Sequence, residues 1–166
     1  MRTRSIVGMV AAAMIVAAVG TRLIHAQQGG AKATLTTQDY IDIQQLYARY
    51  NLAIDTGDAE GWASTFTPDG VFNNSTRGHD ALVQFIHNWR DKLNGANRRH
   101  WNTNLVITPA PGGASGSVYL LLLDIGVRPA VAGTTGMYED ALVKTPQGWR
   151  FKTRVVHGDP APKPAQ

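Results

Sequence analysis

The sequence predicts an α+β domain in which three helices precede most of an antiparallel β-sheet. Apolar residues recur at helical spacing between residues 36 and 93. From Arg98 onward the apolar period changes to two, which is typical of strands. Turns rich in proline and glycine separate the strand-like segments.

Residues 1–26 have the composition of an export signal. Arg2 and Arg4 precede an uncharged apolar stretch over residues 6–20. A membrane anchor is the alternative, but a spanning helix needs ~20 apolar residues, and this stretch is shorter and is followed by Arg22. We therefore expect a protein exported to the periplasm or secreted, which meets the membrane only through this segment before cleavage.

The remaining chain divides into a flexible lead-in at residues 27–35, one domain at 36–158 and a disordered tail at 159–166, which contains three prolines. Removing 26 of 166 residues leaves 140, enough for one domain with a substantial core. The chain has no cysteine, so packing alone must stabilise it. Without the three arginines of the signal, the net charge falls from +4 to +1, and we expect no nucleic-acid partner.

The first helix is predicted to run from an N-cap at Thr36 to a stop near Gly57. Asp39 lies three residues after Thr36, as in a capping box. The apolar residues of this helix fall at i, i+3, i+4, i+7 and i+11, and they are Ile43, Leu46, Tyr47, Tyr50 and Ile54. The pattern indicates an amphipathic helix with one face in the core.

Two shorter helices and a turn are predicted next. Asp58 is a suitable N-cap for a short helix that carries two aromatic residues, Trp62 and Phe66. The turn sequence at residues 67–70 leads to a brief strand, Val71–Phe72. A third helix is expected over Asp80–Leu93, where apolar residues again recur at helical spacing.

Four strands complete the predicted sheet: His100–Thr108, Ser117–Gly126, Thr134–Lys144 and Gly148–His157. Residues 118–123 are apolar at every position, so both faces of that strand must be covered. We expect the helices on one face and a second copy of the chain on the other, which predicts a homodimer through the sheet. Arg150, Lys152 and Arg154 alternate as the solvent face of a strand would.

An ordered set of short motifs then points to a family. In chain order they are a helix ending in Ala-Ile-Asp, then Gly-Asp, a Trp, Phe-x-Pro-Asp-Gly, a strand opening Arg-His, Gly-x-Tyr-x-Asp and a terminal Gly-Trp-Arg-Phe. The order of these motifs resembles that of the SnoaL-like domains of the nuclear transport factor 2-like superfamily. The resemblance covers Thr37 to His157. It implies a cone-shaped α+β barrel, in which a curved antiparallel sheet wraps three helices around a deep, mostly apolar pocket. Similar members include scytalone dehydratase, ketosteroid isomerase, limonene epoxide hydrolase and polyketide cyclases, beside domains that only bind.

The resemblance implies a candidate catalytic pair. Asp55 matches the helix-end acid of scytalone dehydratase, and His100 matches a histidine on its first long strand. A carboxylate can fix the tautomer of an imidazole and raise its basicity, although Asp55 could alternatively act as the base itself. The tyrosine beside that acid is Ile54 here, and the second catalytic histidine falls near Thr135 or Gly136. Dehydration by the same mechanism is therefore not expected.

Seven residues are the candidate pocket lining: Tyr50, Trp62, Phe66, Asn102, Asn104, Tyr138 and His157. Asn102 and Asn104 share strand phase with His100, and either line the pocket or mark an edge strand in contact with water. The opposite face would carry Trp101, Leu105 and Ile107. Tyr50 alternatively belongs to the core.

Two smaller expectations concern other polar residues. Asp140 shares phase with Tyr138 and is expected to be the structural partner of a nearby arginine. His79 and His87 are expected to face solvent.

No cofactor or metal is expected, because the sequence has neither metal-ligand spacing nor a glycine-rich phosphate loop after a strand. Three functions stay open. The domain binds a small apolar molecule without turnover; or it is a cofactor-free isomerase, dehydratase, cyclase or epoxide hydrolase that uses Asp55 and His100; or its sheet face mediates assembly and the pair is incidental.

Overall fold

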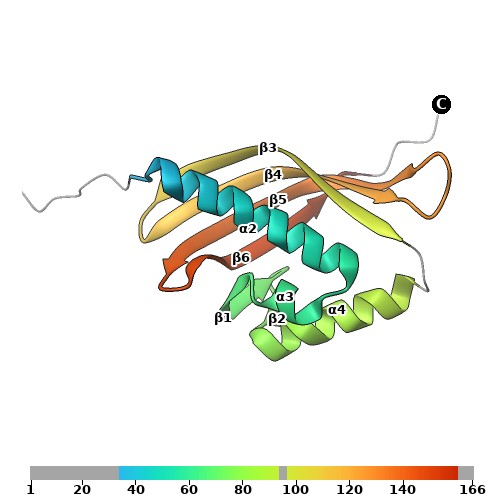
Figure 1. Ribbon diagram of the computed structural model, residues 1–166, viewed down its shortest axis with the longest axis horizontal. Coiled ribbons are helices and arrows are strands. Elements are labelled where there is room, and N and C mark those ends of the chain that lie inside the picture. The colour runs from blue at the N-terminus through green and yellow to red at the C-terminus, as the bar shows by residue number, and fades with distance from the viewer. Residues whose placement is uncertain (1–33, 94–96, 161–166) are drawn as a thin grey trace, which may run out of the picture. The chain divides into compact units, whose positions relative to one another are not determined.

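The computed structural model describes residues 34–93 and 97–160, so the expected signal and most of the lead-in and tail lie outside the described residues. The helices are α2 (Thr37–Thr56), α3 (Ala59–Ala63) and α4 (His79–Leu93). The strands are β1 (Phe66–Phe72), β2 (Thr76–Arg77), β3 (Arg98–Ala110), β4 (Gly113–Asp124), β5 (Val131–Thr145) and β6 (Gly148–Gly158). Figure 1 shows α2 lying across the long strands β3 to β6. Within this part of the chain, no helix is long and apolar enough to cross a membrane.

Helix α2 begins and ends where its sequence predicts. Thr36 and Asp39 form a complete capping box, with the Thr36 N–H donating to Asp39 Oδ2 at 2.9 Å. Gly57 ends the helix in the left-handed conformation, with φ 77°, which glycine adopts without a steric penalty. The residues between them bury one face of α2 against the sheet.

The segment after α3 differs from the expectation. Helix α3 ends at Ala63 and strand β1 begins at Phe66, so Phe66 lies on a strand and not on the second helix. The Phe151 N–H donates to the Thr65 carbonyl oxygen at 2.9 Å, and β1 runs parallel to β6 from that point. The sheet is therefore mixed, because this one pair is parallel and the other four pairs are antiparallel.

The six strands lie in the order β2-β1-β6-β5-β4-β3. The sheet is curved but open, with β2 at one edge and β3 at the other (Figure 1). Strand β4 starts at Gly113, earlier than the predicted Ser117, because Pro111 and Gly112 form a tight turn that pairs Gly113 with Ala110. The predicted α+β architecture, with helices packed against a curved sheet, is confirmed.

A buried polar contact ties the start of α2 to the sheet. Asp39 Oδ1 accepts from Lys144 Nζ at 2.7 Å and from Trp149 Nε1 at 3.0 Å. The Lys144 ammonium, with further hydrogen bonds from Thr36 and Trp149, holds the pKa of Asp39 well below its ordinary value. One carboxylate thus caps α2 and anchors it to the β5–β6 hairpin.

Candidate functional site

Asp55 and His100 meet inside the domain. The imidazole Nδ1 of His100 lies 2.6 Å from Asp55 Oδ1, and the His100 backbone N–H lies 3.1 Å from both carboxylate oxygens. The two side chains are only 6 % and 5 % exposed. A carboxylate can only accept, so the imidazole proton lies on Nδ1 and the neutral ring keeps a lone pair on Nε2. This is the arrangement that a histidine base requires.

The fold creates this contact from two separate elements. Asp55 is on the last turn of α2, and His100 is the third residue of β3. Arg99 approaches the same carboxylate from the exposed side, with Nε 3.5 Å from Asp55 Oδ2. The Trp89 ring of α4 lies 5.7 Å from the imidazole, between ring centroids. The pair is therefore bounded by α2, α4 and β3.

Asn102 takes part in a second contact between α2 and β3. Asn51, one helical turn before Asp55, donates from Nδ2 to Asn102 Oδ1 at 2.7 Å. Asn102 Nδ2 in turn donates to the Tyr119 carbonyl oxygen at 3.1 Å. His100 and Asn102, at the start of β3, therefore both face α2, and the Asn102 amide joins the helix to the strand.

Asn104 lies elsewhere. It sits in a β-bulge between Thr103 and Val106, has φ 57° and is exposed. A bulge adds one residue to one strand and exchanges the two faces beyond it. Leu105 and Ile107 consequently pack against the core, on the face of His100. The expectation that they lie opposite His100 with Trp101 is wrong; Trp101 alone is on the outer face.

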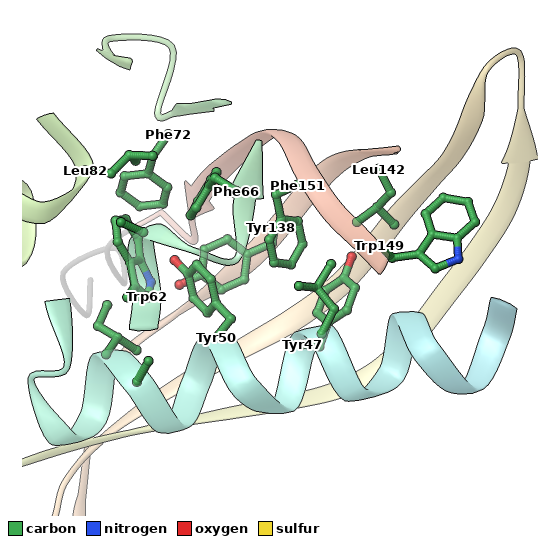
Figure 2. Close-up of a cluster of buried hydrophobic side chains, with 14 of the residues drawn as sticks. Tyr47, Tyr50, Trp62, Phe66, Phe72, Leu82, Tyr138, Leu142, Trp149 and Phe151 are labelled. Atoms are coloured by element: carbon green, nitrogen blue, oxygen red, sulfur yellow. The ribbon is translucent and has the colours of Figure 1, made fainter. Parts of the chain in front are cut away.

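Four of the predicted pocket residues pack together in the core (Figure 2). Tyr50, Trp62, Phe66 and Tyr138 are each at most 3 % exposed. The Tyr50 ring lies 5.3 Å from Trp62 and 6.1 Å from Tyr138, between centroids. Burial raises the pKa of Tyr50 well above its ordinary value, so its hydroxyl stays protonated. The structure brings these four residues together as an aromatic core.

Arg154 is the functional candidate that sequence reasoning missed. Together with Arg150 and Lys152 it was expected on a solvent face, but its side chain is fully buried. A register shift between β5 and β6 pairs Ala141 with Thr153 and Leu142 with Phe151, and so leaves Lys152 as an extra residue. Phe151 and Arg154 thereby share the inner face. The only sign of this change of face in the sequence is the pair Val155 and Val156, which are both apolar and so break the period of two after Arg154.

Asp140 is the acidic neighbour of this arginine, as expected from its strand phase. Asp140 and Arg154 are directly opposed in the β5–β6 pair, with Arg154 Nε 3.6 Å from Asp140 Oδ1. Tyr47 donates its hydroxyl to the other carboxylate oxygen. Burial raises the pKa of Asp140, against the opposing effect of Arg154.

His157 is not part of this interior. It is exposed on β6, with Nε2 3.2 Å from Glu139 Oε2. His79 and His87 are also exposed, as predicted. Among residues 34–93 and 97–160, no group of three or more metal-binding side chains is close enough together to hold a metal ion.

Grooves open on the surface of the described residues. One of about 550 Å³ lies beside α2 and α3 and is lined by Arg49, Leu52 and Arg150 among others. Another of about 320 Å³ lies between α2 and β3 and includes Asn102. Phe66 reaches a third, of about 350 Å³. Asp55 and His100 do not line any of these three.

The chain forms a small α+β domain in which helices pack on one face of a curved sheet. An enclosed pair, the Asp55 carboxylate and the His100 imidazole, lies at the end of the covering helix α2. The sequence profile of the SnoaL-like domain family matches residues 35–155, and the chain belongs to this family. Solved structures of similar fold include nuclear transport factor 2-like proteins with a cystatin-like fold. The predicted family is confirmed. Among curated proteins, no sequence matches the chain.

Three solved structures illustrate the likeness. A protein of unknown function from Mycobacterium tuberculosis is 31% identical, with a TM-score of 0.64, over 72% of this chain and 71% of that one. A protein from Catenulispora acidiphila, solved in complex with S-DNPA, is 29% identical over 74% and 95% of the two chains, with a TM-score of 0.67. ActVI-ORFA from Streptomyces coelicolor, at 24% identity, 75% and 98% coverage and a TM-score of 0.68, shares the fold.

Proposed function

We propose that this protein binds a small hydrophobic molecule between its helices and its sheet and transfers a proton on it, with His100 as the base and Asp55 as the residue that orients it. The observation that carries the proposal is the 2.6 Å contact between two enclosed side chains. Enclosure matters because a carboxylate shielded from water orients and stabilises an imidazolium more strongly than an exposed one.

The division of roles follows from the hydrogen bonds. Asp55 already accepts from the His100 backbone N–H and from Nδ1, and Arg99 lies beside its second oxygen. Its lone pairs are therefore engaged. Nε2 of His100 is the atom left to accept a substrate proton, and Asp55 stabilises the charged ring that results. Asp55 acting as the base itself is the less favoured alternative.

The substrate class is supported by the surroundings of the pair. The interior beyond it is aromatic, with Tyr50, Trp62, Phe66 and Tyr138 in mutual contact. Aromatic walls suit a planar, mostly apolar molecule. The similar protein from Catenulispora acidiphila was solved in complex with S-DNPA, which supports ligand binding by this chain.

A second candidate is binding without turnover. It is favoured by the packing of the interior, because Tyr50 and Trp62 are fully buried against one another. In this case the Asp55–His100 contact serves only to hold the end of α2 against β3.

Deuterium exchange distinguishes the two candidates. The purified full chain is incubated in D₂O with 2-tetralone, an apolar aromatic ketone with acidic α-hydrogens, and exchange at the α-carbon is followed by NMR. General-base catalysis contributes ~10²-fold or more, so His100→Ala should lose about that factor, while His87→Ala, which removes an exposed histidine of α4, should change nothing. Exchange that is unaffected by His100→Ala would exclude the base. Binding of naphthalene without catalysed exchange would favour the second candidate.

The role of Asp55 needs its own readout because it acts through His100. Asp55→Asn should lower the exchange rate while naphthalene still binds, because an amide stabilises the charged ring formed at His100 less than a carboxylate does. Asp55→Glu should restore part of the rate. A loss of rate matched by an equal loss of naphthalene binding would indicate a purely structural role.

We also propose that the protein is exported and acts as a homodimer. Export rests on the signal-like residues 1–26, which lie outside the described residues; cell fractionation with detection of the mature N-terminus tests it. The dimer rests on the outer face of the sheet, where Trp101 and Tyr119 are each 55 % exposed.

A further inference from the structure

A groove on the surface brings two arginines together. It has a volume of about 550 Å³ and lies between α2, α3 and the β5–β6 hairpin. Arg49, Leu52 and Thr56 contribute to its wall from α2, where spacings of three and four residues place them on one face of the helix. Arg150 brings the second guanidinium from β6.

The positive charges of Arg49 and Arg150 are not neutralised by the residues that the structure describes. The ion pairs in this part of the chain all involve other basic side chains. Burial of Arg150 and the like charge of Arg49 both lower the pKa of Arg150, although arginine stays protonated at neutral pH. Two cations that lie close together without an acid between them repel one another, and a bound anion would remove this repulsion.

The groove is built on elements whose positions are fixed. Arg49 lies within α2, and Arg150 pairs with Val143 in the β5–β6 ladder. The turn of this hairpin is held by the Thr145 hydroxyl, which donates to the Gly148 carbonyl oxygen at 2.8 Å. Arg150 Nη1 donates to the carbonyl oxygen of the preceding residue, also at 2.8 Å, which orients the guanidinium. Sites on helices and strands hold their geometry better than sites on loops.

Three other polar side chains of the groove are already engaged. Asp58 Oδ1 accepts from the Gly61 N–H at 2.8 Å, as the cap of α3. The hydroxyls of Thr56 and Ser64 each donate to a backbone carbonyl oxygen, at 2.8 and 2.7 Å. The N–H groups of the two guanidiniums that make no such bond are therefore available to a ligand.

We propose that Arg49 and Arg150 bind the carboxylate of an aliphatic acid in this groove. The charge supports a monoanion, because two arginines and one aspartate, Asp58, give the lining a net charge of +1. Guanidinium groups suit a carboxylate because its two oxygens accept parallel N–H bonds. Leu52 and Ala53 supply apolar surface for the aliphatic chain.

Octanoate and octanamide test the site by calorimetric titration of the purified full chain at pH 7. The two probes have the same chain, and only octanoate is charged, while ~0.15 M NaCl screens unspecific attraction. Wild type should bind octanoate about tenfold more tightly than octanamide, and Arg49→Gln and Arg150→Gln should each reduce this preference by about fivefold or more. Arg77→Gln is the matched control, because it removes an exposed arginine of β2 that does not line the groove.

Loss of the preference in the two groove variants, with retention in Arg77→Gln, supports the site. Arg49→Gln, at an exposed residue, decides the test where Arg150→Gln does not fold. Absence of a preference in wild type, a preference unchanged in Arg49→Gln, or the same loss in Arg77→Gln overturns the site. The exchange experiment with 2-tetralone does not involve this groove, so this inference and the proposed function can each fail alone.

Discussion

At the scale of single residues, the carboxylate of Asp55 has two tasks at once. It receives the backbone N–H and the imidazole of His100, so it holds the first residues of β3 against the end of α2 while it orients the ring. Substitution of Asp55 therefore affects stability as well as chemistry, and the two effects need separate measurements.

Asp55→Asn should lower the free energy of unfolding by about 1.5–3 kcal/mol, the usual contribution of hydrogen bonds to a charged group. Urea unfolding at pH 7 measures it. Asp58→Asn is the control: Asp58 caps α3 through a bond to the Gly61 N–H, and asparagine caps as well as aspartate. An Asp55 variant as stable as the Asp58 variant would show that the enclosed contact contributes nothing.

Asp39 makes stability depend on pH in a known direction. Its pKa is lowered in the folded protein, chiefly by Lys144, so its contribution is complete above the unfolded pKa near ~3.9 and is lost as the pH falls through the folded value. The stability gap between wild type and Asp39→Asn should be constant from pH 7 to about 5 and shrink below about pH 4. Chemical denaturation across this range measures the gap, and a gap that widens in acid would contradict the contact.

At the scale of elements, bulges decide which side chains reach the interior. The β3 bulge depends on a left-handed residue, and asparagine tolerates that conformation better than any β-branched residue does. The β5–β6 register shift has the same effect on Arg154, which it turns inward. Neither the β3 bulge nor the β5–β6 register shift lies at a glycine or a proline, so the sequence does not indicate where the strand faces change.

Asn104→Val should therefore lower the free energy of unfolding by about 1–2 kcal/mol, because valine at φ 57° is strained. Asn104→Gly should be nearly neutral. Thr103→Val, at the exposed neighbour, controls for the added apolar surface. Thermal unfolding of the three variants gives the comparison, and equal melting temperatures for both valine variants would show that the bulge carries no strain.

Helix bounds were largely predictable from local sequence, but strand faces were not. The capping box at Thr36 and the stop at Gly57 both fall where they were expected, because caps act within four residues. Phe66 lies on β1 only because β6, more than eighty residues later, pairs with it. Strand propensity depends on such distant partners far more than helix propensity does.

At the scale of the whole molecule, the outer face of the sheet carries apolar side chains in neighbouring positions. Tyr119 lies between Thr103 and Met137, and Trp101 pairs with Leu121 on the same face. Exposed apolar surface of this kind is typical of an interface. We propose that a second copy of the chain covers this surface, because in a two-fold dimer the outer sheet face of one copy buries the same face of the other.

Tyr119→Glu should convert the proposed dimer to a monomer, because each copy would bury a carboxylate without a partner in the interface. Light scattering after size-exclusion chromatography measures the mass. Leu52→Glu, at a residue 64 % exposed on α2, makes the same kind of change away from the sheet and should leave the dimer intact. A monomeric wild type, or a Tyr119→Glu dimer, would exclude this interface.

The sequence by itself determined the helices, the α+β class and the family, because caps, hydrophobic periods and short ordered motifs are local properties. It also indicated both members of the Asp55–His100 pair. Only the tertiary structure decided that these two residues, 45 positions apart, are in contact, and that Arg154 lies inside while Asn104 lies outside. The physical reason is that one extra residue in a strand reverses its faces, and strand register is set by partners that no local pattern records.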